Sequence, residues 1–257
     1  MKRNRKLVNI NLSAANLRVF GILFLMAGCI STVIQNNVLR VGQISNSHLL
    51  EVIQDRPDGM FYATVALICQ ALEICAVPIF AFLLSEGAKH TANYKSYFLR
   101  VIALACLCEI PYNLLTGNPL FRVGSLNPVF GAVLSLVMIY FFRICREKKA
   151  SHRVVNVLAV LGALLWSAML GVAFGGPFVI LTAVFWATRG RGKIQLFAGC
   201  AAALLCGVFS PLFIFSPTAF LAIYLYSGER GSANKLLNYL AYPAILVVFW
   251  LTSYTVG

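Results

Sequence analysis

The chain has 257 residues, of which 60% are hydrophobic and only 11% charged, and its formal net charge is +13. A soluble domain is about half apolar and about a quarter charged, and one core of this size cannot hide so much apolar surface. The composition therefore excludes an ordinary water-soluble domain and predicts a protein of the lipid bilayer. Because the apolar runs are continuous and backbone groups must pair within the membrane, we expect an all-α, polytopic helix bundle.

About nine membrane-spanning helices are predicted in a single transmembrane domain over residues 1–257, since each needs about 20 apolar residues. In chain order they cover Leu17–Gln35, Phe61–Ser85, Tyr97–Leu115, Val129–Ile144, Val154–Val172, Gly176–Thr188, Ile194–Phe209, Leu212–Ser227 and Leu236–Tyr254. The sixth and eighth segments are short, with Gly175-Gly176-Pro177, Pro211 and Pro217 at their edges. These two segments are therefore expected either to kink or to penetrate only halfway.

The distribution of positive charge predicts the orientation, because Lys and Arg in short loops favour the cytoplasm. With a cytoplasmic amino terminus, only Arg40, Arg56 and Arg122 of the 21 Lys and Arg residues fall outside. Residues 1–16 then form a basic cytoplasmic segment, and residues 36–60 an extracytoplasmic loop. We expect a bacterial-type plasma membrane and a basic face against anionic lipids, with no nucleic-acid partner, since no nucleic-acid-binding module is present.

The eight cysteines indicate neither disulfides nor a metal site. They lie in or at the edge of apolar segments, and none shows the paired spacing of zinc ligands. They are Cys29, Cys69, Cys75, Cys106, Cys108, Cys145, Cys200 and Cys206. We expect reduced core thiols and no metal.

Two carboxylic acids lie within predicted spans, where an unpaired charge costs several kcal/mol. Glu73 is midway through the second span, close to Gln70, and Glu109 is deep in the third, near Asn113. No Lys or Arg shares their depth, so each is a candidate for proton chemistry or for binding a polar substrate. The alternative is a neutral carboxyl hydrogen-bonded to a neighbouring helix.

A second polar group surrounds the loop between the second and third spans. Glu86 and His90 are four residues apart and share a helix face if the helix continues through Gly87. We expect Arg100 to approach Glu86, because Arg pairs bidentately with carboxylates. The alternative is an interfacial salt-bridge cluster in water.

The stretch VPIFAFLLSEGAKHTANYKSYFLRVIALACLCEIPYNLL, Val77 to Leu115, strongly resembles the TraX family. In that family a PIFAFLLVEG-like helix end precedes an HT pair, a YLLRL segment and an xEIP or xQIP segment. NPVFGAVLSLVMIYFF from Asn127 and LNYLAYPAILVV from Leu237 are similar to further family helices. The resemblance implies an integral membrane acetyltransferase, like the founding member that acetylates the amino terminus of a pilin, and related to transmembrane acyltransferases.

The resemblance further implies acetyl-CoA or another acyl-CoA as co-substrate and an amine or hydroxyl acceptor on a membrane protein or peptide. Two departures affect this expectation. The family's first helix usually carries an Asp-His pair after a Met, where this chain has Gly28-Cys29. Its closing helix usually reads YPxH, where Ile245 follows Tyr242-Pro243-Ala244. Cys29 is a poor substitute nucleophile, because an apolar site disfavours the thiolate.

Three functions follow as hypotheses. The first is an acyl-CoA-dependent acyltransferase whose catalytic candidates are Glu109, His90 and Glu86. Its substrate-binding candidates are Arg100, Glu73, Asn113 and Asn127. The second is a non-catalytic family member that binds a lipid, a membrane peptide or a partner subunit, and the third is a small transporter using Glu73 and Glu109 as proton carriers.

Overall fold

The computed structural model describes residues 11–40, 57–118, 125–147, 152–231 and 235–256, and over these ranges the protein is α-helical. The extracytoplasmic loop and the basic amino-terminal segment predicted from the sequence lie largely outside them. The α-helices are α1 (Ala14–Val33), α3 (Gly59–Ile74), α4 (Ala76–His90), α5 (Tyr94–Thr116), α6 (Val129–Glu147), α7 (His152–Met169), α8 (Gly175–Ala187), α9 (Lys193–Leu205), α10 (Ala219–Tyr224) and α11 (Lys235–Val256). A π-helical turn, Ile34–Val38, extends α1, and 3-10 helices cover Cys206–Val208 and Pro211–Thr218.

Three helical stretches in the described residues are long and apolar enough to cross a bilayer: Ala14–Val38, Gly59–His90 and Tyr94–Thr116. The remaining apolar helices are shorter. The predicted first and third spans coincide with α1 and α5, which confirms them as helices. The total of nine spans and the direction of insertion stay predictions.

Two predicted spans differ from the helices that form. The second breaks at Cys75, where α3 ends and α4 begins, and the backbone tightens as the Cys75 N–H donates to the Leu72 carbonyl at 3.0 Å. The eighth is not one α-helix, because Pro211 and Pro217 lie within a 3-10 segment that precedes the short α10. Proline lacks a backbone N–H, so the two prolines of this segment remove two hydrogen bonds from a short stretch, whereas the longer α5 and α11 each contain a single proline.

Local sequence explains the limits of α1 and α5. The Ser13 side chain accepts a hydrogen bond from the Asn16 N–H at 3.3 Å, and Asn93 accepts one from the Ser96 N–H at 3.0 Å, so both helices begin at a capping residue. α5 ends at Gly117, whose φ of 73° lies in the left-handed region that glycine adopts without strain. Both helices therefore begin where a side chain accepts a hydrogen bond from a backbone N–H of the first turn.

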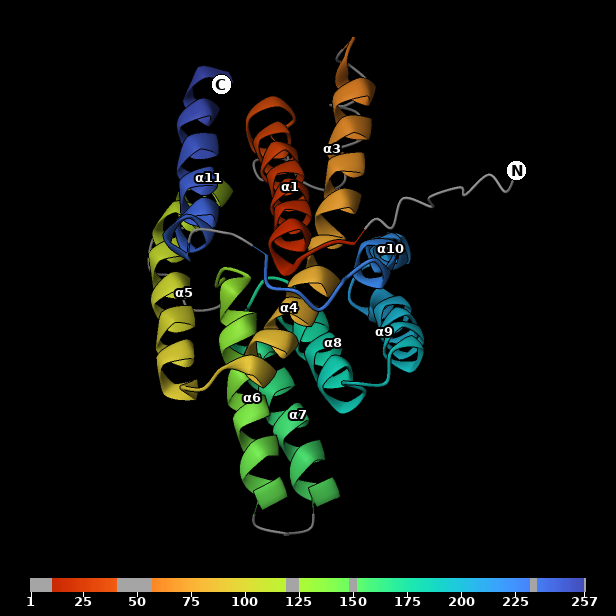
Figure 1. Ribbon diagram of the computed structural model, residues 1–257. Helices are drawn as coiled ribbons and strands as arrows, with labels where there is room; N and C mark the ends of the chain where they lie inside the picture. Colours follow the sequence, from red (N-terminus) through yellow and green to blue (C-terminus); the bar gives the residue numbers. More distant parts are fainter. Residues whose placement is uncertain (1–10, 41–56, 119–124, 148–151, 232–234, 257) are drawn as a thin grey trace, which may run out of the picture.

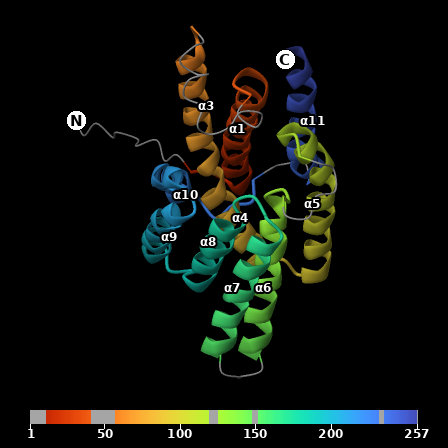
Figure 2. The same cartoon turned by 180° about the vertical axis from the view of Figure 1, so that it is seen from behind.

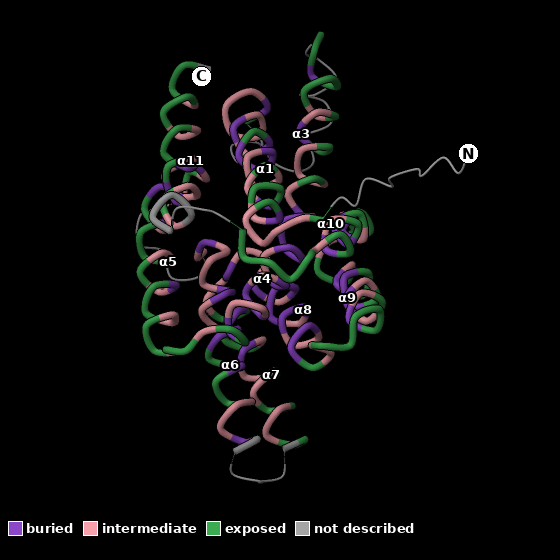
Figure 3. The backbone as a smooth tube through the Cα atoms, viewed as in Figure 1, coloured by how far each residue is buried: buried purple, intermediate pink, exposed green. Residues whose placement is uncertain are grey.

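Helix α4 lies at the centre of the bundle (Figure 1) and packs against α1, α6, α8 and α10. Ile79, Ala81 and Phe82 of α4 are buried in the main core with Leu181 and Phe185 of α8. The view from behind shows α6 and α7 as an antiparallel pair that extends below the rest (Figure 2). Exposure rises from α4 outward to α5 and α11 (Figure 3), and their exposed side chains are largely apolar.

The turns between α4 and α5 and between α8 and α9 lie toward the lower end in Figure 1, where α6 also ends and α7 begins. The charge pattern assigns all of these segments to the cytoplasm. Helices α4 and α5, α6 and α7, and α8 and α9 thus run in opposite directions within each pair, and the direction of insertion stays a prediction.

Candidate functional site

A cavity of about 270 Å³ lies among α1, α3, α4, α5, α6, α8 and α11. Most of its wall is apolar, with Phe80 of α4 and Phe178 of α8 among the larger side chains. The charged residues in the wall are Arg18, Arg100, Arg230 and Glu73. A mostly apolar cavity with a few converging polar groups is the usual form of a ligand site in a helix bundle.

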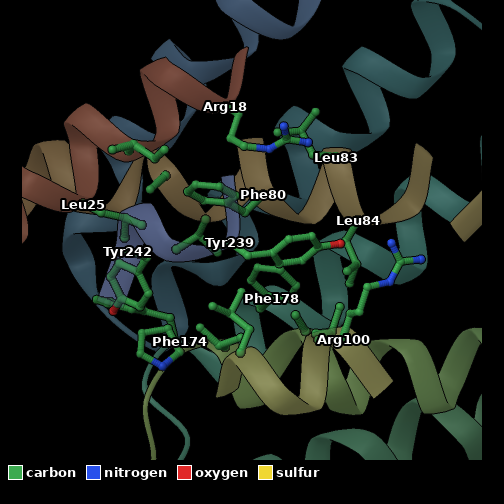
Figure 4. A pocket seen from close by; sticks show the side chains of 18 of the residues that line it. Arg18, Leu25, Phe80, Leu83, Leu84, Arg100, Phe174, Phe178, Tyr239 and Tyr242 are labelled. Carbon is green, nitrogen blue, oxygen red and sulfur yellow. The ribbon is translucent and has the colours of Figure 1, made fainter. Parts of the chain in front are cut away.

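The arginines come from three separate parts of the chain. Arg18 is in the first turns of α1, Arg100 is in the second turn of α5, and Arg230 is in the segment before α11. In Figure 4 the side chains of Arg18 and Arg100 reach the same end of the cavity, away from Leu25 and Tyr242. Arg230 and Arg100 are exposed and Arg18 is partly so. This end therefore opens to the outside of the bundle and is positively charged.

Tyrosines add hydroxyl groups to the cavity wall. The ring of Tyr239 from α11 lies between Arg18 and Arg100 in Figure 4. Tyr239 and Tyr97 both interact electrostatically with Arg18, and Tyr242 stands at the opposite end. A ligand in this cavity meets cationic donors at one end and neutral hydroxyls along its length.

Glu73 supplies the acidic group, from the last turn of α3. Its carboxyl lies directly over Gly28 of α1: a Cβ added at Gly28 would fall 2.5 Å from Oε1 and 2.6 Å from Cγ of Glu73. Such distances are far inside van der Waals contact, so the carboxyl occupies the space that any side chain at position 28 would need. Within the described ranges, Glu73 makes neither a hydrogen bond nor an ion pair, and its electrostatic neighbours include Tyr112 and Tyr242.

The two charged regions of the cavity are well separated along α1. Arg18 and Gly28 are ten residues apart, which corresponds to about 15 Å at 1.5 Å per residue. Since the Glu73 carboxyl lies over Gly28, it is about that far from the level of Arg18 along the helix axis. The cavity is thus basic at its open end and acidic at its inner end.

Glu109 does not line this cavity, and both oxygens of its carboxyl accept hydrogen bonds. Oε1 accepts from Asn113 Nδ2 at 2.9 Å, and Oε2 accepts from the Asn127 backbone N–H at 3.1 Å and from Asn127 Nδ2 at 2.7 Å. Asn127 in turn donates to the Ala105 carbonyl at 2.8 Å and accepts from the Val129 N–H at 2.9 Å. The three polar residues fix the start of α6 against α5 and lie outside the cavity wall, which Pro128, Val129 and Ala132 reach.

The group around Glu86 is a surface cluster at the end of α4. The helix continues through Gly87 to His90, and Glu86 lies 3.3 Å from His90 Nε2 and 3.5 Å from Lys89 Nζ. The expectation that Arg100 approaches Glu86 was wrong for the described structure. Arg100 Nε instead donates to the Ser96 carbonyl at 3.0 Å, and the side chain lines the cavity. Arg100 lies exposed at the open end of the cavity, whereas His90 and Lys89 pair with Glu86 on its own helix.

Of the seven residues that the sequence proposes for a site, Glu73 and Arg100 both line the cavity, at its opposite ends, and the other five lie outside its wall. Sequence reasoning missed Arg18, Arg230 and Tyr239. The available signal was weak: Arg18 and Arg230 were counted only as positive charge near helix ends. Ile245, at the position of the family's usual histidine, packs in a separate apolar cluster with Cys29 and Cys108.

Comparison with known proteins gives one result. A family model described as TraX protein matches residues 49–253. No curated protein and no solved structure gives a significant match.

Proposed function

The chain belongs to the TraX family, and we propose that it is an acyltransferase of the bacterial plasma membrane. It transfers an acyl group from acyl-CoA to an amine or hydroxyl on a membrane-associated protein or peptide. The observation that carries this proposal is the division of one cavity into a basic open end and an acidic inner end. Acyl-CoA has the matching division, with phosphates at one end and a reactive thioester at the other.

The arginines suit the phosphates of CoA. Guanidinium groups donate paired hydrogen bonds to phosphate oxygens, and they remain charged at any physiological pH. Arg18, Arg100 and Arg230 approach from three chain segments, so they can surround a flexible, multiply charged group. We expect the nucleotide to rest at this open end.

The cavity size fits the narrow arm of acyl-CoA better than the whole molecule. Its volume of about 270 Å³ is near the lower limit of ligand pockets, which hold about 300–1,000 Å³. In the proposal the pantetheine arm crosses the apolar middle, beside Phe80 and Phe178. The thioester then reaches the inner end, about 15 Å from the level of the phosphates along α1.

The proposal predicts that acetyl-CoA binds and that binding depends on the arginines. Purified protein in lipid nanodiscs is titrated with acetyl-CoA by calorimetry, comparing the wild type with Arg18→Gln, Arg100→Gln and Arg230→Gln. Each substitution removes a phosphate donor and should weaken binding about tenfold, because a hydrogen bond to a charged group contributes about 1.5–3 kcal/mol.

Arg191→Gln is the matched control, since Arg191 is exposed in the turn between α8 and α9 and lies outside the cavity wall. It should bind as the wild type does. Loss of affinity that is equal in Arg191→Gln and the cavity variants would indicate a general charge effect. No binding of acetyl-CoA to the wild type would contradict the proposed function.

A non-catalytic lipid-binding protein is the second candidate, favoured by the largely apolar cavity wall. An anionic lipid would also place phosphate on the arginines and acyl chains beside the phenylalanines. Native mass spectrometry separates the two candidates: a co-purified lipid that acetyl-CoA does not displace supports the second.

The transporter hypothesis needed Glu73 and Glu109 in one vestibule, and the bonding of Glu109 to Asn127 gives it no support.

The proposal also requires the arginine end to face the cytoplasm, where acyl-CoA is found. The charge pattern assigns this orientation. In a variant without native cysteines, a cysteine at Ala92, in the turn between α4 and α5, should react with an impermeant maleimide only after the cells are opened. Labelling of Ala92→Cys in intact cells would reverse the orientation and remove access to acyl-CoA.

A further inference from the structure

We infer that Glu73 is the general base of this acyl transfer, and that Gly28 is the positioning residue that makes room for it. The inference rests on the proposed function, because it names the group that accepts the acceptor's proton. It departs from the sequence, which favoured Glu109 for proton transfer and His90 and Glu86 as further candidates.

The first argument is location. Glu73 is the acidic residue in the cavity wall, whereas Glu109, Glu86 and His90 lie outside that wall. A general base must come within hydrogen-bond reach of the proton that it removes. Glu73 meets this requirement for any acceptor that reaches the inner end, and the other three do not.

The second argument is availability. Glu109 accepts three hydrogen bonds that fix the start of α6, and Glu86 pairs with Lys89 and His90 on its own helix. The Glu73 carboxyl has neither a hydrogen bond nor an ion pair to the described residues. Leaving a polar group without a partner in an apolar bundle costs free energy, so this arrangement fits a group that binds or reacts with a ligand.

The third argument is the close approach to Gly28. With any other residue at position 28, the Cβ atom would overlap the Glu73 carboxyl. Gly28 therefore lets the carboxyl of α3 lie against the backbone of α1, and the two helices together fix its place at the inner end of the cavity. Such fixed geometry is what general-base catalysis needs.

The chemical step balances without a further reactant. The nitrogen or oxygen of the acceptor attacks the thioester carbonyl carbon, and a bond to that carbon forms as the carbon–sulfur bond breaks. The Glu73 carboxylate takes the proton from the acceptor and passes it to the departing thiolate, so that CoA leaves as the free thiol. The carboxylate is regenerated for the next turnover.

Glu73→Gln tests the inference, because Gln has the same shape and cannot accept the proton. In nanodiscs with acetyl-CoA and a membrane-anchored peptide amine, CoA release is followed with a thiol reagent. We expect kcat to fall at least about 100-fold, as is typical for loss of a general base, while the affinity for acetyl-CoA stays within about twofold. Glu73→Asp, which shortens the side chain but keeps the carboxylate, should recover part of kcat.

Asp58→Asn is the matched control. It makes the same carboxyl-to-amide change at the N-cap of the same helix, where the Asp58 side chain makes no capping hydrogen bond, about 22 Å from Glu73, and it should leave kcat unchanged. If Glu73→Gln transfers acyl groups as fast as the wild type does, the inference is wrong and the proposed function survives. If the wild type binds acetyl-CoA and releases no CoA, both are overturned.

Discussion

Two carboxylic acids on separate helices of this protein, α3 and α5, have opposite surroundings. Glu109 in α5 accepts one hydrogen bond from Asn113 and two from Asn127, so both of its oxygens are bonded within the protein. Glu73 in α3 faces a cavity and lies over Gly28. The same residue type therefore joins two helices at one site and remains free for a ligand at the other. The difference depends on what the adjacent helices present, and this comparison leads to three predictions.

The largest change in stability is expected for Glu109→Gln. The amide that replaces one oxygen would point a donor at the donors of Asn113 or Asn127, and a buried group would lose its partner. We expect the free energy of unfolding to fall by about 2–3 kcal/mol. Glu73→Gln should change it by less than about 0.5 kcal/mol, because it breaks no hydrogen bond.

Thermal unfolding of both variants in the same detergent gives the comparison directly. A larger loss of stability in Glu73→Gln than in Glu109→Gln would show that the roles of the two carboxyl groups are reversed.

A smaller loss is expected for Gly28→Ala, because the added methyl group overlaps the Glu73 carboxyl. Overpacking costs at least about 1 kcal/mol, and we expect a loss of about 1–1.5 kcal/mol, because the clashing atoms are at the end of the Glu73 side chain and can shift. In a Glu73→Ala background the space is vacant, so Gly28→Ala should cost much less there. The double-mutant cycle measures this coupling by thermal unfolding.

Gly162→Ala in α7 serves as the control, since a Cβ at that position meets nothing within 4 Å. It should stabilise the protein by about 0.5–1 kcal/mol through lower backbone entropy in the unfolded chain. An equal cost for Gly28→Ala with and without the Glu73 side chain would exclude the contact as the cause.

The smallest effect is expected for His90→Ala. The His90 side chain is 66% exposed, and Glu86 keeps Lys89 at 3.5 Å when the histidine is removed. Exposed ion pairs contribute little, so the free energy of unfolding should change by no more than about 0.5 kcal/mol. If His90→Ala lowered the unfolding temperature as much as Glu109→Gln does, the ion pair between His90 and Glu86 would contribute to stability and our assignment of it to the surface would be wrong.

The sequence by itself determined the membrane class, the helical nature of the spans and the family. Within a bilayer, a continuous apolar run can pair its backbone N–H and C=O groups only by forming a helix. Composition and the length of the runs therefore suffice to predict membrane helices. The segment from Val77 to Leu115 carried enough polar positions in register to indicate the TraX family, which the match over residues 49–253 shows. The limits of α1 and α5 also followed closely, because capping and apolar length act locally.

Only the tertiary structure decided which polar residues meet. Hydropathy gives depth along a helix but not the direction in which a side chain points. The sequence therefore placed Glu109 among the catalytic candidates, although Glu73 is the one that lines the cavity. The cavity brings together Arg18, Arg100 and Arg230 from three distant segments, and no spacing rule connects them. The role of Gly28 could not be predicted for the same reason, because it depends on contact with the carboxyl of Glu73, which is 45 residues further along the chain on another helix. Packing between helices sets such contacts, and the sequence of one helix does not contain them.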